Sequence, residues 1–261
     1  MALDFLAYVR SESQRFAAAL RHVDPAAAVP SCPDWTAADL LWHLAGVHSM
    51  WAMIVRDRVR ELDPEAAPPP RPDAYDALFD FYERSTAELV DALASTPDDT
   101  PVWTWAPDQH VGFVRRFQAH EALIHRIDAE LTAGTLPTPL PPDLAADGID
   151  VVLRYSMSWR PGWATWTPTG GVGLIQASDT GDRHTVRLGG WGGTSPDTGK
   201  TFDDEAAIEL ADDAAPTFSV TAPAANLDAW LWNRPGFAEV SVDGSADDAE
   251  RFRTQVVAGV Q

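Results

Sequence analysis

The residues best suited to chemistry lie in one short segment, residues 115–128, which holds two histidines and two carboxylates. Helical residues five positions apart point about 140° away from each other, so His120 and His125 cannot bind one metal ion from the same face. This spacing excludes the metalloprotease helix motif, whose two histidines are four positions apart. Glu121 and His125 are four positions apart, so they lie one above the other and can share a metal ion.

A polar stripe continues from this pair along the same helix. Gln118 and Asp128 extend it, whereas four apolar residues fall roughly on the opposite side and indicate a core face: Phe117, Leu123, Ile127 and Leu131. The spacing leaves two interpretations open. The stripe is either a metal-binding face or a solvent-exposed face, on which Glu121 and His125 would form a weak surface pair.

A third ligand has to come from another helix, and His43 is the best candidate because it stands in the almost wholly apolar stretch 41–46. A buried imidazole needs a polar partner, which is either a metal ion or a backbone carbonyl. His48 is five residues further along and points about 140° away from His43, so we do not expect it to be a ligand. Two imidazoles and one carboxylate, with a fourth position open, are typical of catalytic zinc rather than structural zinc.

Four segments of helical periodicity carry these residues and predict a four-helix bundle over residues 1–136. The segments are Leu3–Arg21, Ala37–Arg60, Asp73–Ala94 and Phe113–Ala133. Thr36 and Asp39 predict a capping box at the start of the second helix, and Gly134 predicts a left-handed C-cap after the fourth. Residues 137–143 are rich in proline, which favours an extended linker between two domains.

The remainder, residues 144–261, alternates between helical and β-type runs and predicts a smaller α+β domain. Helices are expected at Leu144–Met157, Ala224–Trp232 and Ala246–Val257, and strands at Val172–Ala177, Thr185–Leu188, Thr217–Thr221 and Glu239–Val242. We interpret Gly189–Gly193 as a turn, because it lacks the spacing and the lysine of a phosphate-binding loop. Four tryptophans, at positions 159, 163, 166 and 191, are expected either to form core or to line an apolar cleft.

Composition narrows the function classes further. With 19 basic and 39 acidic residues, the net charge is −20 and the pI is near 4.5, so the surface repels phosphate backbones and anionic lipid headgroups. We therefore expect no nucleic acid and no membrane partner, and the most apolar run, residues 40–55, is too short to span a bilayer. Charged residues near the N-terminus argue against a signal peptide, so we predict a cytoplasmic protein.

The lone cysteine, Cys32, excludes an intramolecular disulfide and a multi-cysteine zinc module. It precedes Pro33 just before a predicted helix, a position that indicates a small packed residue rather than a nucleophile.

Two runs of this sequence resemble the motifs of the mycothiol-dependent maleylpyruvate isomerase family of actinobacteria. The first comprises residues 29–36, Val-Pro-Ser-Cys-Pro-Asp-Trp-Thr, continued by Asp39-Leu40 and by His43-Leu44-Ala45-Gly46. The second comprises Glu121 and His125 followed by Arg126, Asp128 and Gly134. Residues 228–235 and 240–244 are similar to the end of a sterol carrier protein, so the resemblance spans nearly the whole chain. It implies a DinB-like four-helix metal-binding domain followed by a smaller α/β domain like sterol carrier protein.

The resemblance also implies roles for individual residues. His43, Glu121 and His125 would bind a divalent ion, usually Zn²⁺, which would hold the thiolate of mycothiol, the low-molecular-weight thiol of actinobacteria. Arg234 matches an arginine that the C-terminal domain contributes to the site, although the residue before it, commonly glycine in the family, is Asn233 here. The thiolate would attack a small-molecule electrophile, and the outcome would be cis–trans isomerisation or S-transfer.

Two alternatives to this function remain open. The first is a metal-dependent hydrolase, in which the open zinc position activates water and no thiol is needed. The second is a non-catalytic protein that holds an apolar ligand in the carrier-like domain and is indifferent to metal removal.

Overall fold

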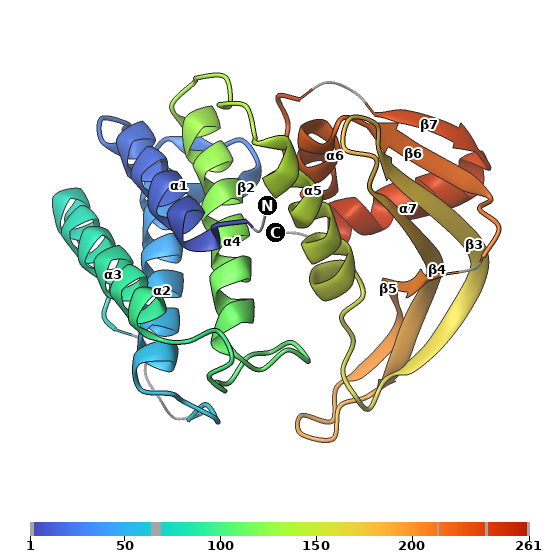
Figure 1. Cartoon of the computed structure of the whole chain (residues 1–261), viewed down its shortest axis with the longest axis horizontal. Coiled ribbons are helices and arrows are strands. Elements are labelled where there is room, and N and C mark those ends of the chain that lie inside the picture. Colours follow the sequence, from blue (N-terminus) through green and yellow to red (C-terminus); the bar gives the residue numbers. More distant parts are fainter. Residues whose placement is uncertain (1–2, 64–68, 213, 238–239, 260–261) are drawn as a thin grey trace. The chain divides into compact units, whose positions relative to one another are not determined.

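The computed structural model describes residues 3–63, 69–212, 214–237 and 240–259 (Figure 1). The chain divides into two compact units, Met1–Thr138 and Pro139–Gln261. The division falls inside the proline-rich segment 137–143. In this segment Pro142 already begins a helix, where its missing N–H is not needed.

The first unit contains four long helices lying side by side (Figure 1). They are α1 (Phe5–Leu20), α2 (Ala37–Arg56), α3 (Tyr75–Ser95) and α4 (Val111–Thr132). All four predicted helices are therefore confirmed. Helix α1 packs most closely against α4, and α2 packs most closely against α3. A short hairpin that the sequence did not suggest, β1 (Ala28–Val29) and β2 (Cys32–Thr36), precedes α2.

Local signals explain where two of these helices begin and end. The predicted capping box is present, since the N–H of Asp39 donates to Thr36 Oγ1 and the N–H of Thr36 donates to Asp39 Oδ2. Gly134 follows α4 with φ of 72°, as a left-handed C-cap requires. Helix α2 ends earlier than predicted, because Arg58 adopts φ of 51° and thereby stops the helix before Arg60.

A buried ionic cluster joins three parts of the first unit. Arg126 of α4 is fully buried; its Nε donates to Glu12 Oε2 of α1 at 2.9 Å, and its Nη1 donates to Glu130 Oε2 at 2.7 Å. The same Nη1 also donates to the carbonyl of Thr138 at 2.8 Å. The cluster therefore ties the last residue of the unit to its longest helix.

The second unit is a five-stranded mixed sheet with helices on one face (Figure 1). The strand order is β5-β4-β3-β6-β7, and β3 and β6 are parallel whereas the other neighbours are antiparallel. The strands are β3 (Thr165–Ala177), β4 (Arg183–Thr194), β5 (Thr201–Ala211), β6 (Phe218–Ala222) and β7 (Ser241–Gly244). The helices are α5 (Pro142–Val151), its π-helical continuation η1 (Val152–Met157), α6 (Ala224–Leu231) and α7 (Ala246–Gly259). The predicted α+β class is confirmed.

The strands of this unit differ from the sequence predictions in three places. Gly189–Gly193 is not a turn but the middle of β4, where a Cβ atom on Gly189 would lie 2.4 Å from the ring of Trp166. These glycines provide space for close packing rather than a change of direction. Strand β5 was missed because its acidic residues, Asp203 to Glu205, have low β propensity, which pairing with β4 overrides. The predicted strand Glu239–Val242 is shifted to Ser241–Gly244, and Glu239 itself lies outside the described residues.

The tryptophans of this unit do not all contribute to its core. Trp191 is buried and its ring lies 5.8 Å from that of Trp163, whereas Trp159 is 49% exposed. The expectation of core is therefore confirmed for Trp191 and wrong for Trp159.

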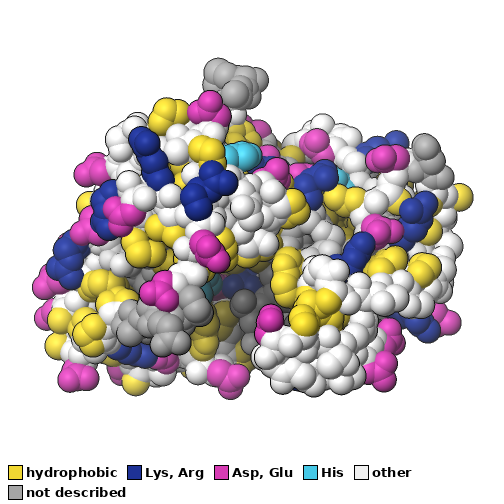
Figure 2. Space-filling model, turned by 90° about the horizontal axis from the view of Figure 1, so that it is seen from below, with side chains coloured by type: hydrophobic (Ala, Val, Ile, Leu, Met, Phe, Trp, Pro, Cys, Tyr) yellow, Lys and Arg dark blue, Asp and Glu magenta, His cyan; other side chains and the backbone are white. Residues whose placement is uncertain are grey.

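The surface is consistent with the acidic composition. On the face shown in Figure 2, Asp and Glu side chains are scattered rather than gathered into one patch. In the described part of the chain, no helix combines the length and the apolar character needed to cross a membrane.

Candidate metal centre

Three predicted site residues come together in the first unit. His43 of α2 and Glu121 and His125 of α4 each offer one ligand atom, and these atoms lie within 4.8 Å of one another. Glu121 Oε1 lies 3.3 Å from His43 Nε2 and 3.3 Å from His125 Nε2. Among the described residues, no other group of three or more His, Cys, Asp or Glu side chains meets this condition.

The local sequence explains why these atoms meet. Glu121 and His125 are one turn apart on α4, so their side chains extend from the same face of that helix. His43 lies on α2, whose start is fixed by the capping box described above. The three side chains therefore converge from two helices that pack side by side.

An aromatic side chain from the β1–β2 hairpin covers the two histidines. The Trp35 ring lies 4.7 Å from the His43 ring and 6.2 Å from the His125 ring. The histidine rings are themselves 4.7 Å apart in an edge-to-face arrangement. His125 is 7% exposed, but His43 is 34% exposed, so the group is accessible from the His43 side.

A second carboxylate fixes the orientation of His125. Asp128 Oδ2 lies 2.9 Å from His125 Nδ1, and Ser31 Oγ donates a hydrogen bond to Asp128 Oδ1. With Nδ1–H directed at Asp128, Nε2 points toward Glu121 and is the nitrogen left for a metal ion. Carboxylate partners of this kind are regularly found behind metal-binding histidines. The sequence analysis placed Asp128 in the polar stripe but did not predict that it orients His125. The signal that could have shown this is the acidic residue three positions after the histidine.

The polar stripe of α4 is inside the bundle, so the interpretation of it as a solvent-exposed face is wrong. Gln118 and Asp128 are fully buried, and the amide of Gln118 has no hydrogen-bond partner within the described part of the chain. The expected core face is confirmed at Leu123 and Ile127, whereas Phe117 is only half-buried. Helix α4 is thus buried on most of its circumference. Its mixture of polar and apolar residues did not predict this burial.

The charges of the group stabilise one another. Burial disfavours the ionised form of Glu121, but hydrogen bonds from His125 and His43 outweigh this effect and hold the pKa of Glu121 well below its ordinary range. Burial likewise disfavours the imidazolium of His125, but Asp128 and Glu121 outweigh it and raise the pKa of His125 to about 9. In the metal-free protein, His125 is therefore protonated, and its positive charge lies between the carboxylates of Glu121 and Asp128.

Two other histidines lie in the bundle core, apart from the ligand group. His48 is fully buried, with its Nδ1 2.9 Å from Thr86 Oγ1, and burial lowers the pKa of His48 to about 3. His120 is 1% exposed and packs against the Phe5 ring at 6.2 Å. Neither belongs to the group of three, in agreement with helical geometry.

Arg234 lies in the second unit, just after α6. It is buried, and its Nη1 donates to the carbonyl of Trp232 at 2.6 Å. The preceding Asn233 has φ of 53°, the left-handed conformation that glycine adopts freely and asparagine tolerates better than most residues. Asparagine at position 233 is therefore compatible with a left-handed turn at the end of α6.

Cys32 lies on β2 and is buried. This burial agrees with the expectation of a packed residue. It leaves the ligand group without a cysteine of its own.

The donor set fits a divalent transition-metal ion. Two imidazole nitrogens and one carboxylate are typical ligands of zinc and of iron(II), and the carboxylate behind His125 is a further mark of such sites. The exposed side of His43 provides room for a fourth ligand from solution.

The fold and the site define a four-helix domain with a candidate metal centre, joined to an α+β unit. Residues 6–130 match the family model described as mycothiol maleylpyruvate isomerase N-terminal domain, which covers nearly all of the first unit. The first unit therefore matches the N-terminal domain of the mycothiol maleylpyruvate isomerase family, and the resemblance drawn from the motifs is confirmed.

Two solved structures share the fold along nearly the whole chain. One is the mycothiol-dependent maleylpyruvate isomerase, with 16% sequence identity, a TM-score of 0.61 and 93% of each chain covered. The other is a histidine-to-alanine mutant of the mycothiol-dependent maleylpyruvate isomerase, with 15% identity, a TM-score of 0.61 and coverage of 91% of this chain and 92% of that one. No curated protein matches the chain significantly.

The ligand group leads to a first prediction. Replacing His43, Glu121 or His125 by alanine should each lower zinc affinity by more than a hundredfold, because one of only three protein ligands is lost. Asp128→Asn should lower it about 10- to 100-fold, since the orienting hydrogen bond is weakened but no ligand is removed. Competition with a fluorescent chelator measures these affinities.

The matched controls are His48→Ala and His120→Ala, which remove buried histidines outside the group. Both should retain zinc at wild-type affinity, even if the fold is destabilised. Full zinc occupancy in all three ligand variants would contradict the assignment.

The raised pKa of His125 leads to a second prediction. Zinc binding near pH 7 should release about one proton, because His125 is protonated in the metal-free protein and must lose that proton to coordinate. Calorimetric titration in buffers of different ionisation enthalpy measures this release, which should decline above about pH 9.

The stability of the metal-free protein should also depend on pH through the protonation of His125. Because the pKa of His125 is higher in the folded protein than in the unfolded chain, protonation of His125 stabilises the fold. This contribution is complete below about pH 6.5 and is lost as the pH rises through about 9. Zinc-loaded protein should not show this loss. Equal thermal stability of the metal-free protein at about pH 6.5 and about pH 10 would contradict the protonated state of His125.

Proposed function

We propose that this chain is a zinc-dependent enzyme that uses mycothiol to attack an electrophilic small molecule. The observation that carries the proposal is the ligand group His43–Glu121–His125, with Asp128 orienting its most buried histidine. The family of the first unit supports mycothiol as the thiol. We propose zinc because two imidazoles, one carboxylate and an accessible fourth position are typical of its catalytic sites.

The thiol has to come from solution, because Cys32 is the chain's lone cysteine and is buried in the hairpin. A bound divalent ion supplies Lewis acidity, which lowers the pKa of a thiol beside it so that the thiolate is present at neutral pH. The exposed side of His43 is where such a thiol can approach. Trp35 excludes water from the other side of the two imidazoles.

The reaction class follows from the nucleophile. The thiolate sulfur would add to an activated cis double bond, so that a C–S bond forms and the π electrons move onto the activating group. Rotation about the resulting single bond and expulsion of the thiolate would then give the trans product. If the adduct is protonated instead of eliminating the thiolate, the thioether is the product and the reaction is an S-transfer.

The residues of the chain hold the ion and its surroundings in place during these steps. Asp128 would hold the Nδ1 proton of His125, so that the Nε2 lone pair would be available to a metal ion. Glu121 balances the charge of a divalent cation. We further propose that Arg234 binds an anionic group of the substrate or of the thiol, since its planar guanidinium pairs with carboxylates through two hydrogen bonds. The reaction would take place in the cytoplasm, with no nucleic acid or membrane as partner.

A third prediction concerns the thiol. Zinc-loaded protein should convert its electrophile only when mycothiol is added, with saturable activation as mycothiol is titrated. Incubation with a panel of electrophiles, followed by absorbance and mass spectrometry, separates isomerisation from thioether formation.

Two outcomes would overturn the proposal. Equal turnover without thiol would favour the metal-dependent hydrolase. No turnover, together with an apolar ligand that is retained on purification and unaffected by chelators, would favour the non-catalytic binding protein.

A fourth prediction separates catalysis from helix capping at Arg234. Arg234→Ala should lower kcat/KM at least tenfold while leaving zinc affinity unchanged, because the metal ligands are all in the first unit. The control is Arg253→Ala, since Arg253 also contacts the end of α6, donating to Asn233 Oδ1 at 2.9 Å. It should lower the melting temperature but preserve turnover. Unchanged turnover in Arg234→Ala, with a lowered melting temperature, would show that Arg234 only caps the helix.

A further inference from the structure

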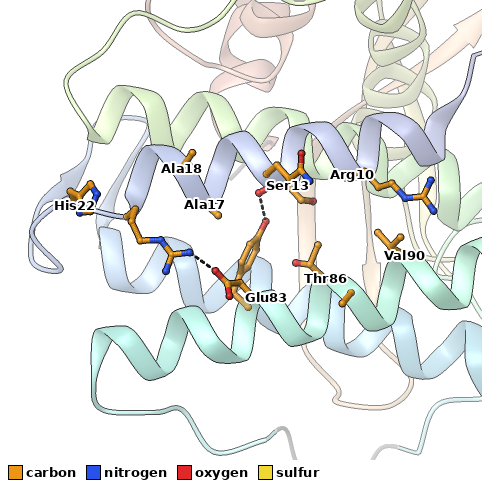
Figure 3. A pocket seen from close by; sticks show the side chains of 12 residues that line it. Arg10, Ser13, Ala17, Ala18, His22, Glu83, Thr86 and Val90 are labelled. Carbon is orange, nitrogen blue, oxygen red and sulfur yellow. Dashed lines mark hydrogen bonds and ion pairs between the residues drawn. The ribbon is translucent and has the colours of Figure 1, made fainter.

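The packing of the four helices leaves two looser seams in the bundle. Helices α1 and α4 pack closely, as do α2 and α3, whereas the α2–α4 and α1–α3 contacts are less extensive. The α2–α4 seam holds the candidate metal centre. The α1–α3 seam is hollowed into a groove with a volume of about 740 Å³ (Figure 3).

The groove is open because small side chains line much of it. On α1 the lining residues recur at helical spacing, and on α3 they form a matching stripe. They are Arg10, Ser13, Gln14, Ala17 and Ala18 on α1, Arg21 and His22 just after it, and Tyr82, Glu83, Thr86, Ala87 and Val90 on α3. From Arg10 to Arg21 this stripe spans twelve residues, which corresponds to a length of roughly 16 Å. That length accommodates an extended small molecule.

One buried polar group in the groove lacks a partner. Ser13 is 1% exposed, and its Oγ makes no hydrogen bond within the described part of the chain. Its carbonyl, by contrast, accepts a hydrogen bond from Tyr82 Oη at 2.9 Å. Figure 3 shows Ser13 on the side of α1 that faces α3. An unpaired buried hydroxyl is unfavourable, so a ligand that supplies an acceptor would stabilise this position.

The charges along the groove favour an anion. Arg10 stands at one end of the groove (Figure 3), and Arg21, eleven positions further along the chain, also lines it. Arg21 is paired with Glu83 and lies over the Phe79 ring at 4.2 Å. Arg10, however, has no ion-pair partner among the residues that the structure describes. In a chain with twice as many acidic as basic residues, an unpaired arginine at a groove provides charge complementarity for a carboxylate.

We propose that the α1–α3 groove binds an amphipathic carboxylate, separately from the candidate metal centre. One carboxylate oxygen would accept from the Arg10 guanidinium and the other from Ser13 Oγ, since these residues are one helical turn apart. The apolar body would extend from Ser13 along Ala17, away from Arg10 (Figure 3). The expected ligand therefore has a negatively charged head that accepts two hydrogen bonds, and an apolar tail.

Calorimetric titration of the full-length, zinc-loaded protein with decanoate below its micelle concentration tests this proposal. Decanoate should bind saturably with one site per chain, and decylamine, which carries the opposite charge, should not. Arg10→Gln should lower decanoate affinity at least tenfold, because the charge-assisted pair is lost. The matched control is Arg15→Gln on the same helix outside the groove, which should leave the affinity unchanged.

Two further measurements show whether decanoate binds in the groove rather than elsewhere on the protein. Ala17→Leu should fill the groove and abolish binding. If that variant does not fold, Ser13→Ala provides a second test and should weaken binding severalfold. Removing zinc should leave decanoate affinity unchanged, since the groove contains no metal ligand. The proposal is overturned if wild type shows no saturable binding, if Arg10→Gln and Arg15→Gln bind equally, or if binding requires zinc.

Discussion

The first unit depends on the burial of polar and charged side chains along α4. Asp128 is buried behind His125, and Arg126 is buried between Glu12 and Glu130. A buried charge is tolerated only when its partners are held in place, and removing one partner of such a pair costs about 3–5 kcal/mol. Helix α4 therefore cannot rotate or slide relative to α1 without leaving charges unpaired. This constraint fixes the direction in which Glu121 and His125 point.

The same constraint explains why the candidate metal centre is rigid on one side and accessible on the other. His125 is held by Asp128, which in turn accepts from Ser31 of the hairpin that precedes α2. His43 belongs to the more loosely packed neighbour α2 and is partly exposed. A preorganised ligand paired with an accessible one is suited to a catalytic ion that must also accept an exogenous thiol. The seam between α1 and α3 is lined mainly by small side chains and remains open as a groove.

In the second unit, the backbone conformation of single residues decides the local structure at two places. Asn233 adopts the left-handed turn that glycine would adopt, so Arg234 follows α6 with the backbone hydrogen bonds of a helix end. In β4, glycines allow Trp166 and Asp204 to lie directly against the strand. The turn after α6 thus forms without a glycine, whereas the glycines of β4 permit close packing within a sheet.

The sequence by itself determined the features that depend on neighbouring residues. Helical periodicity and the Thr36–Asp39 capping box located the four helices, and the four-residue spacing of Glu121 and His125 placed them on one face. Only the tertiary structure decided which face of α4 is buried, because a polar stripe looks the same whether it faces water or partners from other segments. Asp128 gained its role from Ser31, nearly a hundred residues away, and strand β5 formed against its own propensity because β4 supplied hydrogen bonds. Contacts between residues that are far apart in the sequence produce no periodic pattern along it. They therefore become visible only in the tertiary structure.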